Sequence, residues 1–267
     1  MNLAPRFRRW GFATLTLLLL TALVGFAGCR QKTEGRDAAA NNASGTSEWQ
    51  APASPGIPPE AKALHEKARI LGERGALKQA IELLDQSSVL APTWPYPLYD
   101  KAYTQLLSGD PEGALASYQS VDRLAPEGFF TTKTAVWSLT REQAGTFPKG
   151  TYQTYLQIEW AKSDAEKRQI VEDLLKRVPT FAPAWKESAL LQEAPEKRLA
   201  DLEHGLGLAP DAETEGLLTL NRATTLDSLG KRDECIRLLS SLAQATNSTV
   251  GTKALAKATL AMVLEKK

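Results

Sequence analysis

Two neighbouring stretches of this chain carry the same residues at the same intervals. After 34 residues, two alanines, a glycine and a proline recur: Ala68, Gly75, Ala80 and Pro92 are followed by Ala102, Gly109, Ala114 and Pro126. A period of this length is typical of a small helical hairpin that is stacked several times. Each hairpin has to bury its apolar face against a neighbour, so this period constrains the fold more than the composition does.

Each repeated residue suits one place in such a hairpin. A glycine accepts the left-handed backbone that ends the first helix. Asp110 and Pro111 suit the cap and the first turn of a second helix, and the final proline stops that helix. The alanines fall midway along each helix, where a small side chain lets two helices approach closely. We therefore expect helix-turn-helix units over 61–94 and 95–128.

A third copy is expected near the carboxyl end. Ala223, Gly230 and Cys235 keep the intervals of seven and five residues, so 216–249 is predicted to form another unit that lacks only the final proline. Cys235 then occupies a small-residue position, which predicts an inert, packed thiol. Residues 252–264 are predicted to form an amphipathic helix that covers this last hairpin.

The pattern is looser in the middle of the chain. Residues 130–144 are interpreted as an unpaired helix with Trp137 facing inward. A weaker pair is expected over 150–179, where Ser163 and Glu166 have the spacing of a capping box. The pairing of the helices in this region stays open.

After this irregular region the repeat pattern returns. Trp185 and Ala189 fit positions of a first helix, and the ending LGLAP at 206–210 repeats the ending of the first two units. Strand signals are close to absent. The prediction is an all-α chain of stacked hairpins.

The spacing and the residue types together are similar to the tetratricopeptide repeat (TPR), a helix-turn-helix unit of 34 residues. This resemblance implies a TPR-like right-handed superhelical α-solenoid over 59–267. It also implies binding of other proteins or peptides, with no catalysis and no cofactor.

The family resemblance assigns a candidate protein-binding groove. The fifth and ninth positions of a TPR point into its concave side, and they are His65 and Arg69 in the first unit and Tyr99 and Tyr103 in the second. Tyr96 adds one more turn, and three tyrosines at i, i+3 and i+7 share one face of a helix. The alternative is that this tyrosine row packs beneath the neighbouring unit.

The carboxylate clamp known from this family does not carry over. His65 and Arg69 stand at its lysine and asparagine positions in the first unit, and Asp100 stands at its asparagine position in the second. An extended or helical peptide of another envelope protein is therefore the expected ligand, in place of an acidic carboxyl-terminal tail.

The amino terminus has the order typical of an export signal. Arginines at 6–9 precede an uncharged apolar run over 10–28. The run ends in VGFAGC, which resembles the lipobox of bacterial lipoproteins, although Phe26 departs from the usual aliphatic residue. The resemblance implies that 1–28 is a lipoprotein signal peptide and that Cys29 is lipidated. An uncleaved anchor is the alternative, since 19 apolar residues span roughly 28 Å.

Residues 29–58 are expected to form a lipidated cysteine followed by a disordered linker, because Ala, Asn, Ser, Gly and Pro dominate. Either reading of the amino terminus places the rest of the chain outside the inner membrane. Arg30 follows the cysteine, where an aspartate would favour retention in the inner membrane. An exported, membrane-anchored protein of the bacterial cell envelope is predicted, with the outer membrane or periplasm favoured.

The charge and the motifs of the sequence argue against other functional classes of protein. Beyond residue 28 the chain has 29 basic and 31 acidic residues, which disfavours nucleic-acid binding. Two cysteines exclude a four-cysteine metal site. No hydrolase, phosphate-loop or zinc-protease motif is present, and His65 and His204 are expected far apart. The prediction is a non-catalytic scaffold. A self-assembling structural repeat protein is the alternative, and an envelope hydrolase with its site in 129–179 is a remote one.

Overall fold

The computed structural model describes residues 56–265, and its regular elements are helical throughout that range. Most helices are joined by short turns, as expected for stacked hairpins. In chain order the elements are α2 (Pro59–Glu73), α3 (Leu77–Leu90), α4 (Pro95–Leu107), α5 (Pro111–Leu124), α6 (Thr132–Gln143), α7 (Thr151–Leu156), the 3-10 helix η1 (Gln157–Trp160), α8 (Asp164–Arg177), α9 (Ala182–Leu190), α10 (Pro195–Leu206), α11 (Ala212–Ser228), α12 (Arg232–Gln244) and α13 (Val250–Glu265).

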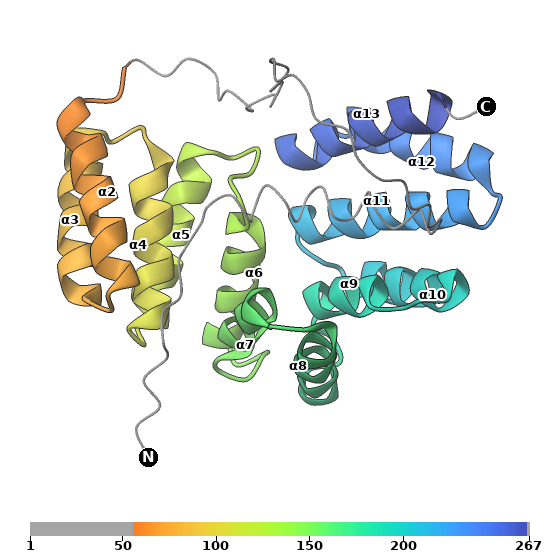
Figure 1. Ribbon diagram of the computed structural model, residues 1–267, viewed down its shortest axis with the longest axis horizontal. Helices are drawn as coiled ribbons and strands as arrows, with labels where there is room; N and C mark the ends of the chain where they lie inside the picture. Colours follow the sequence, from red (N-terminus) through yellow and green to blue (C-terminus); the bar gives the residue numbers. More distant parts are fainter. Residues whose placement is uncertain (1–55, 266–267) are drawn as a thin grey trace, which may run out of the picture.

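The helices pack as antiparallel neighbours along the chain. The closest pairs are α2 with α3, α4 with α5, α9 with α10, and α11 with α12, and α13 lies on α12. Figure 1 shows α2 to α6 standing side by side and α9 to α13 lying across them, with α7 and α8 between the two sets. The predicted all-α solenoid of helical hairpins is confirmed.

The residues that predicted the repeat occupy their assigned places. Gly75, Gly109 and Gly230 end first helices with φ of +79°, +82° and +77°, a left-handed conformation that costs other residues energy. Asp110 caps α5 by accepting a hydrogen bond from the Gly113 amide at 2.8 Å. The small residues at the helix contacts are 0–1% exposed: Ala68, Ala80, Ala102, Ala114, Ala223 and Cys235.

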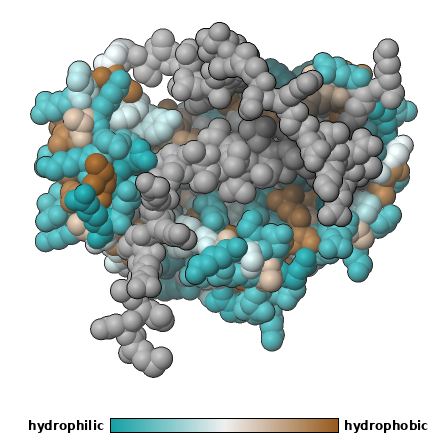
Figure 2. Space-filling model, viewed as in Figure 1, coloured by the Kyte–Doolittle hydropathy of each residue, from teal (hydrophilic) through white to brown (hydrophobic). Residues whose placement is uncertain are grey.

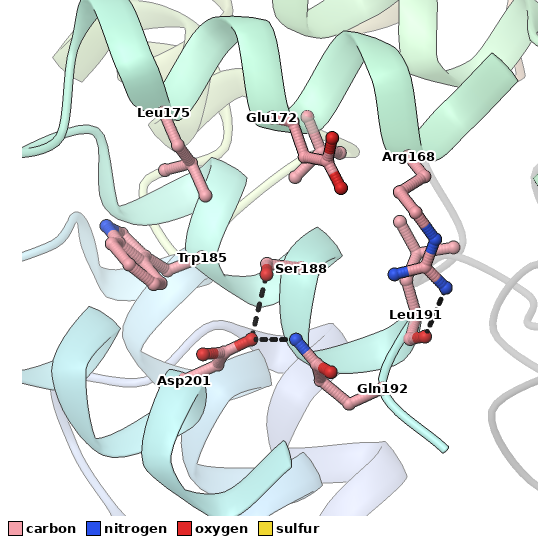
Figure 3. Close-up of a pocket in the computed structure, with 9 residues that line it drawn as sticks. Arg168, Glu172, Leu175, Trp185, Ser188, Leu191, Gln192 and Asp201 are labelled. Atoms are coloured by element: carbon pink, nitrogen blue, oxygen red, sulfur yellow. Dashed lines mark hydrogen bonds between the residues drawn. The ribbon is translucent and has the colours of Figure 1, made fainter. Parts of the chain in front are cut away.

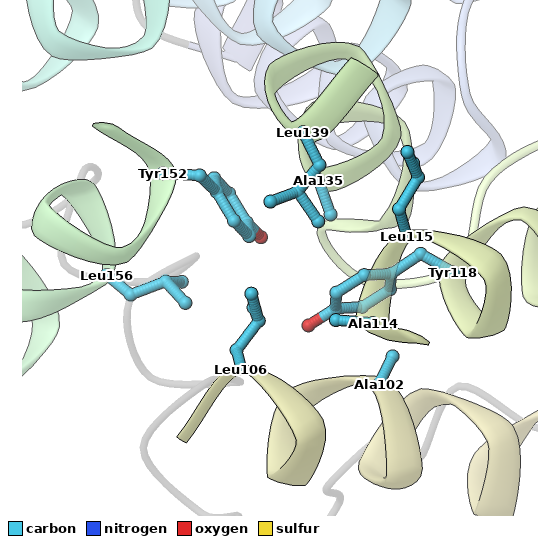
Figure 4. Packing of buried hydrophobic residues seen from close by; sticks show 9 residues of the cluster. All are labelled: Ala102, Leu106, Ala114, Leu115, Tyr118, Ala135, Leu139, Tyr152 and Leu156. Atoms are coloured by element: carbon cyan, nitrogen blue, oxygen red, sulfur yellow. The ribbon is translucent and has the colours of Figure 1, made fainter. Parts of the chain in front are cut away.

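The core of the first half shows why small residues are needed. Ala102 of α4 faces Ala114 of α5, and this close contact leaves room for the ring of Tyr118 (Figure 4). Tyr118 and Tyr152 are fully buried, with ring centroids 6.4 Å apart. Because Tyr152 comes from α7, the cluster joins the second hairpin to the irregular middle of the chain.

The prediction that 130–144 forms an unpaired helix is wrong. Helix α6 packs between α5 and α7 and also contacts α11. The structure places Trp137 half-buried, with its ring 5.2 Å from Phe147 and 5.9 Å from Phe181 and with Arg141 lying 4.0 Å above it. The sequence missed the pairing because α7 has only six residues before it tightens into η1.

The capping box predicted for the weaker helix pair over 150–179 is confirmed at the start of α8. The Ser163 hydroxyl accepts from the Glu166 amide at 3.2 Å at the start of α8. The Glu166 carboxylate accepts from the amide of Lys162, one residue before the cap, at 2.7 Å. These bonds satisfy amide groups that a helix leaves unpaired at its beginning.

Contacts distant in sequence join the two halves. The Thr134 hydroxyl of α6 lies 3.1 Å from Oδ1 of Asp211 and 3.2 Å from the Thr214 hydroxyl at the start of α11. The amide of Val250 donates to the carbonyl of Glu127 at 2.8 Å. Beside that bond, Gly128 lies so close to the side chain of Thr249 that a residue with a Cβ would not fit at position 128. The solenoid is therefore bent so that α11 lies against α6.

The surface of the described residues is mostly polar. The coloured part of the face in Figure 2 is largely hydrophilic, with separate small apolar patches. The most exposed large apolar side chains are Val89 at 79%, Leu264 at 58% and Trp160 at 47%. Between residues 56 and 265, no helix is both long and apolar enough to cross a membrane.

Candidate functional site

The tyrosine row of α4 shares one helix face, as predicted, and most of it packs against the segment that follows α5. Tyr96 meets Phe129 and Phe130 edge-on, with centroids 4.9 and 5.6 Å apart. The Tyr99 hydroxyl lies 2.8 Å from that of Thr131. Burial raises the pKa of Tyr99 well above its usual value. These two rings are thus engaged by residues of the chain itself.

The candidate residues of α2 are also engaged. Nε2 of His65 lies 2.8 Å from Oδ2 of Asp100, and its ring packs edge-on against Trp94 at 4.9 Å. Arg69 forms an ion pair with Glu66 at 3.2 Å. His65 is 8% exposed, so it links the first hairpin to α4 and offers little contact area to a ligand.

Tyr103, at the other end of the row, is the most suitable of the predicted residues for contact with a partner. Its ring is half-buried and meets Trp160 edge-on, with centroids 6.3 Å apart. Burial raises the pKa of Tyr103, and the nearby carboxylate of Glu159 raises it further. Tyr103 and Trp160 together form an aromatic edge beside an exposed carboxylate.

A polar cluster that the sequence did not predict lies near this edge. Nζ of Lys186 in α9 lies 2.8 Å from Oε1 of Glu187 and 3.0 Å from the hydroxyl of Tyr155 in α7. Burial favours the neutral amine, but the Glu187 carboxylate and the Tyr155 hydroxyl outweigh it and hold the pKa of Lys186 well above its ordinary value. The ammonium group is therefore already bound within the chain.

Helix α11 adds a carboxylate to the same region. Burial raises the pKa of Glu213 to about 8, and the charge of Asp211 adds to this shift while Lys186 opposes it. Oε2 of Glu213 is buried, and hydrogen bonds between Thr134 and the carboxyl group also oppose the rise of its pKa. Asp211 itself caps α11 by accepting from the amides of Glu213 and Thr214, each at 3.1 Å.

Electrostatic interactions and ring contacts link these side chains into one group, which is largely buried except at Glu159 and Trp160 and is here called the inner surface. Its members come from five elements and are Tyr99, Tyr103, Tyr155, Glu159, Trp160, Lys186, Glu187 and Glu213. The carboxylates of Glu159 and Glu213 both raise the pKa of Tyr99, although they stand on η1 and α11, so both lie within electrostatic range of its hydroxyl. The middle of the chain thus brings charges from the second half next to the tyrosines of the first.

The sequence predicted Tyr99 and Tyr103 of this surface and missed the other members. They lie in the region whose helix pairing was left open, so nothing indicated which of them face α4. The run TYQTYLQIEW at 151–160 contains Tyr155, Glu159 and Trp160. Its density of aromatic residues was the available signal, because such side chains are enriched at binding surfaces.

A separate hollow of about 370 Å³ lies between α8, α9 and α10 (Figure 3). Trp185 and Leu175 flank one end, and at the other end Arg168 donates to the Leu191 carbonyl at 2.8 Å. On the α10 side, Asp201 accepts hydrogen bonds from Ser188 and Gln192, each at 2.8 Å. The polar groups drawn in Figure 3 are thus largely bonded to each other.

The remaining predictions concern metal ligands and the two cysteines. From 56 to 265, no group of three metal-ligating side chains is suitably placed to hold an ion. Cys235 is fully buried in a cluster between α11, α12 and α13, as expected for a packed thiol. Cys29 and the signal segment 1–28 lie outside the described residues.

Comparison with known proteins finds similarity of fold only. No family model matches this chain, and no curated protein matches it. Seventy chains of solved structures do match. The tetratricopeptide protein TTC0263 of Thermus thermophilus is 16% identical, with 76% of this chain and 98% of that chain covered and a TM-score of 0.34.

Two further solved structures show the same level of similarity. YrrB, described as a TPR protein with an unusual peptide-binding site, is 10% identical over 74% of this chain and 91% of its own, with a TM-score of 0.33. A tetratricopeptide repeat protein from Parabacteroides merdae is 13% identical over 77% of this chain and 84% of its own, with a TM-score of 0.35. The chain is thus similar to TPR proteins in its helical repeats.

Proposed function

We propose that this chain is a non-catalytic scaffold that binds a segment of another protein across its inner surface. The observation that supports this best is the convergence of aromatic and charged side chains from five elements on one surface, with Trp160 47% exposed. Aromatic side chains with polar tips are favoured in protein interfaces, where they provide contact area at low entropic cost.

The proposal includes the location of the scaffold. The lipobox-like end of residues 10–28 supports attachment of the chain to a bacterial envelope membrane through Cys29. Envelope proteins are then the partners. Labelled palmitate is expected to be incorporated into the wild type and to be lost in Cys29→Ala. Persistent labelling in the variant would reject lipidation at this cysteine.

Site-specific photocrosslinking in cells tests the binding surface. A photoreactive phenylalanine derivative in place of Trp160 is expected to capture a defined partner protein. The same derivative in place of Val89, which is 79% exposed at the end of α3, serves as the control. Equal capture from both positions, or none from position 160, would contradict the proposed inner-surface site.

Self-assembly is the second candidate, and a specific observation favours it. The first hairpin and the last helix expose apolar side chains, Val89 on α3 and Leu264 on α13. Contact between two different surfaces of identical chains would build open chains. Light scattering at rising protein concentration separates the two functions, because an adaptor stays at constant mass whereas a self-assembling protein grows.

A further inference from the structure

We propose that the hollow between α8, α9 and α10 binds an arginine side chain of a partner protein. Glu172 and Asp201 bind its guanidinium group, and Trp185 packs against it. This inference goes beyond the proposed function, because the hollow shares no residue with the inner surface. The chain then has a second contact site, and the chemistry of the partner at that site is named.

The hollow is enclosed by three helices of unequal length. Helix α9 has nine residues, whereas α8 and α10 have 14 and 12. Trp185, Ser188 and Gln192 follow one another at intervals of three and four residues, so they face the hollow from one side of α9 (Figure 3). The volume of about 370 Å³ lies near the lower end of the range of roughly 300–1,000 Å³ for ligand sites. This space suits one large side chain better than a cofactor.

Two carboxylates line the hollow from different helices. Glu172 is an exposed residue of α8, and Asp201 is a half-buried residue of α10 (Figure 3). Among the described residues, neither forms an ion pair within 4.0 Å. Ser188 and Gln192 both donate to Oδ2 of Asp201, so within the described part of the chain Oδ1 accepts no hydrogen bond. Both carboxylates can therefore accept from a donor outside the chain.

The basic side chains near the hollow are bound to backbone carbonyls. Arg168, which lines the hollow, donates to the Leu191 carbonyl at 2.8 Å, at the end away from Trp185 (Figure 3). Arg198 of α10 donates to the Gln192 carbonyl at 2.7 Å. The lining thus has two carboxylates and one guanidinium group, which leaves an excess of negative charge. The complementary ligand is therefore a cation.

The tryptophan at the other end favours arginine among the cations. Nε1 of Trp185 donates to the Pro179 carbonyl at 2.7 Å, and the ring packs against His204 with centroids 4.2 Å apart, so its orientation is fixed. A guanidinium group stacks on such a ring and donates in several directions, so it can bind two carboxylates at once, whereas a lysine ammonium is a point charge. The apolar stem of the arginine packs against Leu175.

An NMR titration of the full chain in detergent micelles with Nα-acetyl-arginine methylamide tests the inference. The indole N–H signal of Trp185, assigned with Trp185→Phe, is expected to shift and to reach saturation. The citrulline analogue has a neutral urea in place of the guanidinium group and should bind at least about tenfold more weakly. The indole signal of Trp160, which is 47% exposed on the inner surface, is the internal control and should not move.

The matched protein variants change the same charge on the same two helices. Glu172→Gln with Asp201→Asn removes both carboxylates, and asparagine keeps an oxygen that accepts hydrogen bonds. Asp173→Asn with Glu196→Gln is the control, because these exposed residues of α8 and α10 do not line the hollow. Circular dichroism checks that both variants fold like the wild type. Binding of the arginine amide should weaken at least about tenfold in the first variant and persist in the control.

Several results would overturn the proposal. They are no saturable shift of Trp185, equal binding of the citrulline analogue, or equal weakening in both double variants. Equal binding of the lysine amide would reject the preference for a guanidinium group. Tighter binding of free arginine than of its amide would reject a partner protein as the source. Each of these results leaves the inner-surface function standing, because crosslinking from position 160 decides that function.

Discussion

The first two hairpins and the middle of the chain are held together by different kinds of contact. In α2 to α5 the contacts link helices adjacent in sequence, through small residues such as Ala80 and Ala114 that are fully buried. In α6 to α8 the helices are shorter or looser, and large aromatic rings fill the space between them. The first arrangement is encoded locally and can be repeated. The second occurs once, and it creates the bend and the inner surface.

Phe181→Ala is expected to have the largest effect on stability, because it removes the ring around which the aromatic side chains in the middle of the chain pack. Phe181 is fully buried, with centroids 5.5 Å from both Phe147 and Tyr155. The loss should lower the free energy of unfolding by about 3–5 kcal/mol, the usual cost of such a cavity. Denaturant unfolding followed by circular dichroism measures it.

The matched change in the first hairpin is Leu84→Ala, at a residue that is 1% exposed. Hydrogen exchange should show faster opening of α2 and α3 in this variant and of α7 to α9 in Phe181→Ala. Faster exchange in the same helices for both variants would mean that the two regions unfold as one unit, and the contrast between them would be lost.

Asp211→Ala tests the junction between the halves. Asp211 accepts bonds from two amides of α11 and from the hydroxyls of Thr134 and Thr214, so its removal leaves buried donors unpaired. We expect a loss of about 2–3 kcal/mol in the free energy of unfolding. Asp110→Ala removes the N-cap of α5, in the second hairpin, and should cost only about 1 kcal/mol. Equal losses would show that the buried hydroxyls contribute nothing.

The two regions also differ in how far the sequence predicts them. The positions of Gly75, Gly109 and Gly230 could be predicted because the signals for a turn lie within a few residues of it. The bond between Thr134 and Asp211 joins residues 77 positions apart and has no periodic signal. The tyrosine row was placed correctly on one helix face, but the packing of Tyr96 and Tyr99 depends on Phe129 and Phe130. The sequence GFF around them is too short to predict a contact.

Glu213→Gln is expected to change how stability depends on pH. The folded pKa of about 8 lies above the ordinary value of 4.5, so the folded state binds the proton more tightly than the unfolded state. The contribution of Glu213 to stability is complete below about pH 4.5 and is lost as the pH rises to 8. A shift of this size corresponds to about 5 kcal/mol for a fully buried group. Because the side chain of Glu213 is partly exposed, solvent screening reduces this effect, and over this range the wild type should lose about 2 kcal/mol more than the variant. Glu215→Gln should follow the wild type, and parallel curves for all three proteins would contradict the burial of this carboxyl group.

Gly109→Ala should have the smallest effect on stability. It tests whether the turn between α4 and α5 needs glycine for its backbone conformation alone. Gly109 has φ of +82°, and an added Cβ would meet no atom within 4 Å, so the cost comes only from the left-handed conformation. That cost is about 1 kcal/mol. Gly251→Ala is the matched control, since its site in α13 is also open but has no positive φ, and there alanine should be neutral or slightly stabilising. Thermal unfolding of both variants measures the difference. A loss well above 1 kcal/mol in Gly109→Ala would mean that this turn also carries a packing contact, so the first two hairpins would depend on more than the local signals that predict them.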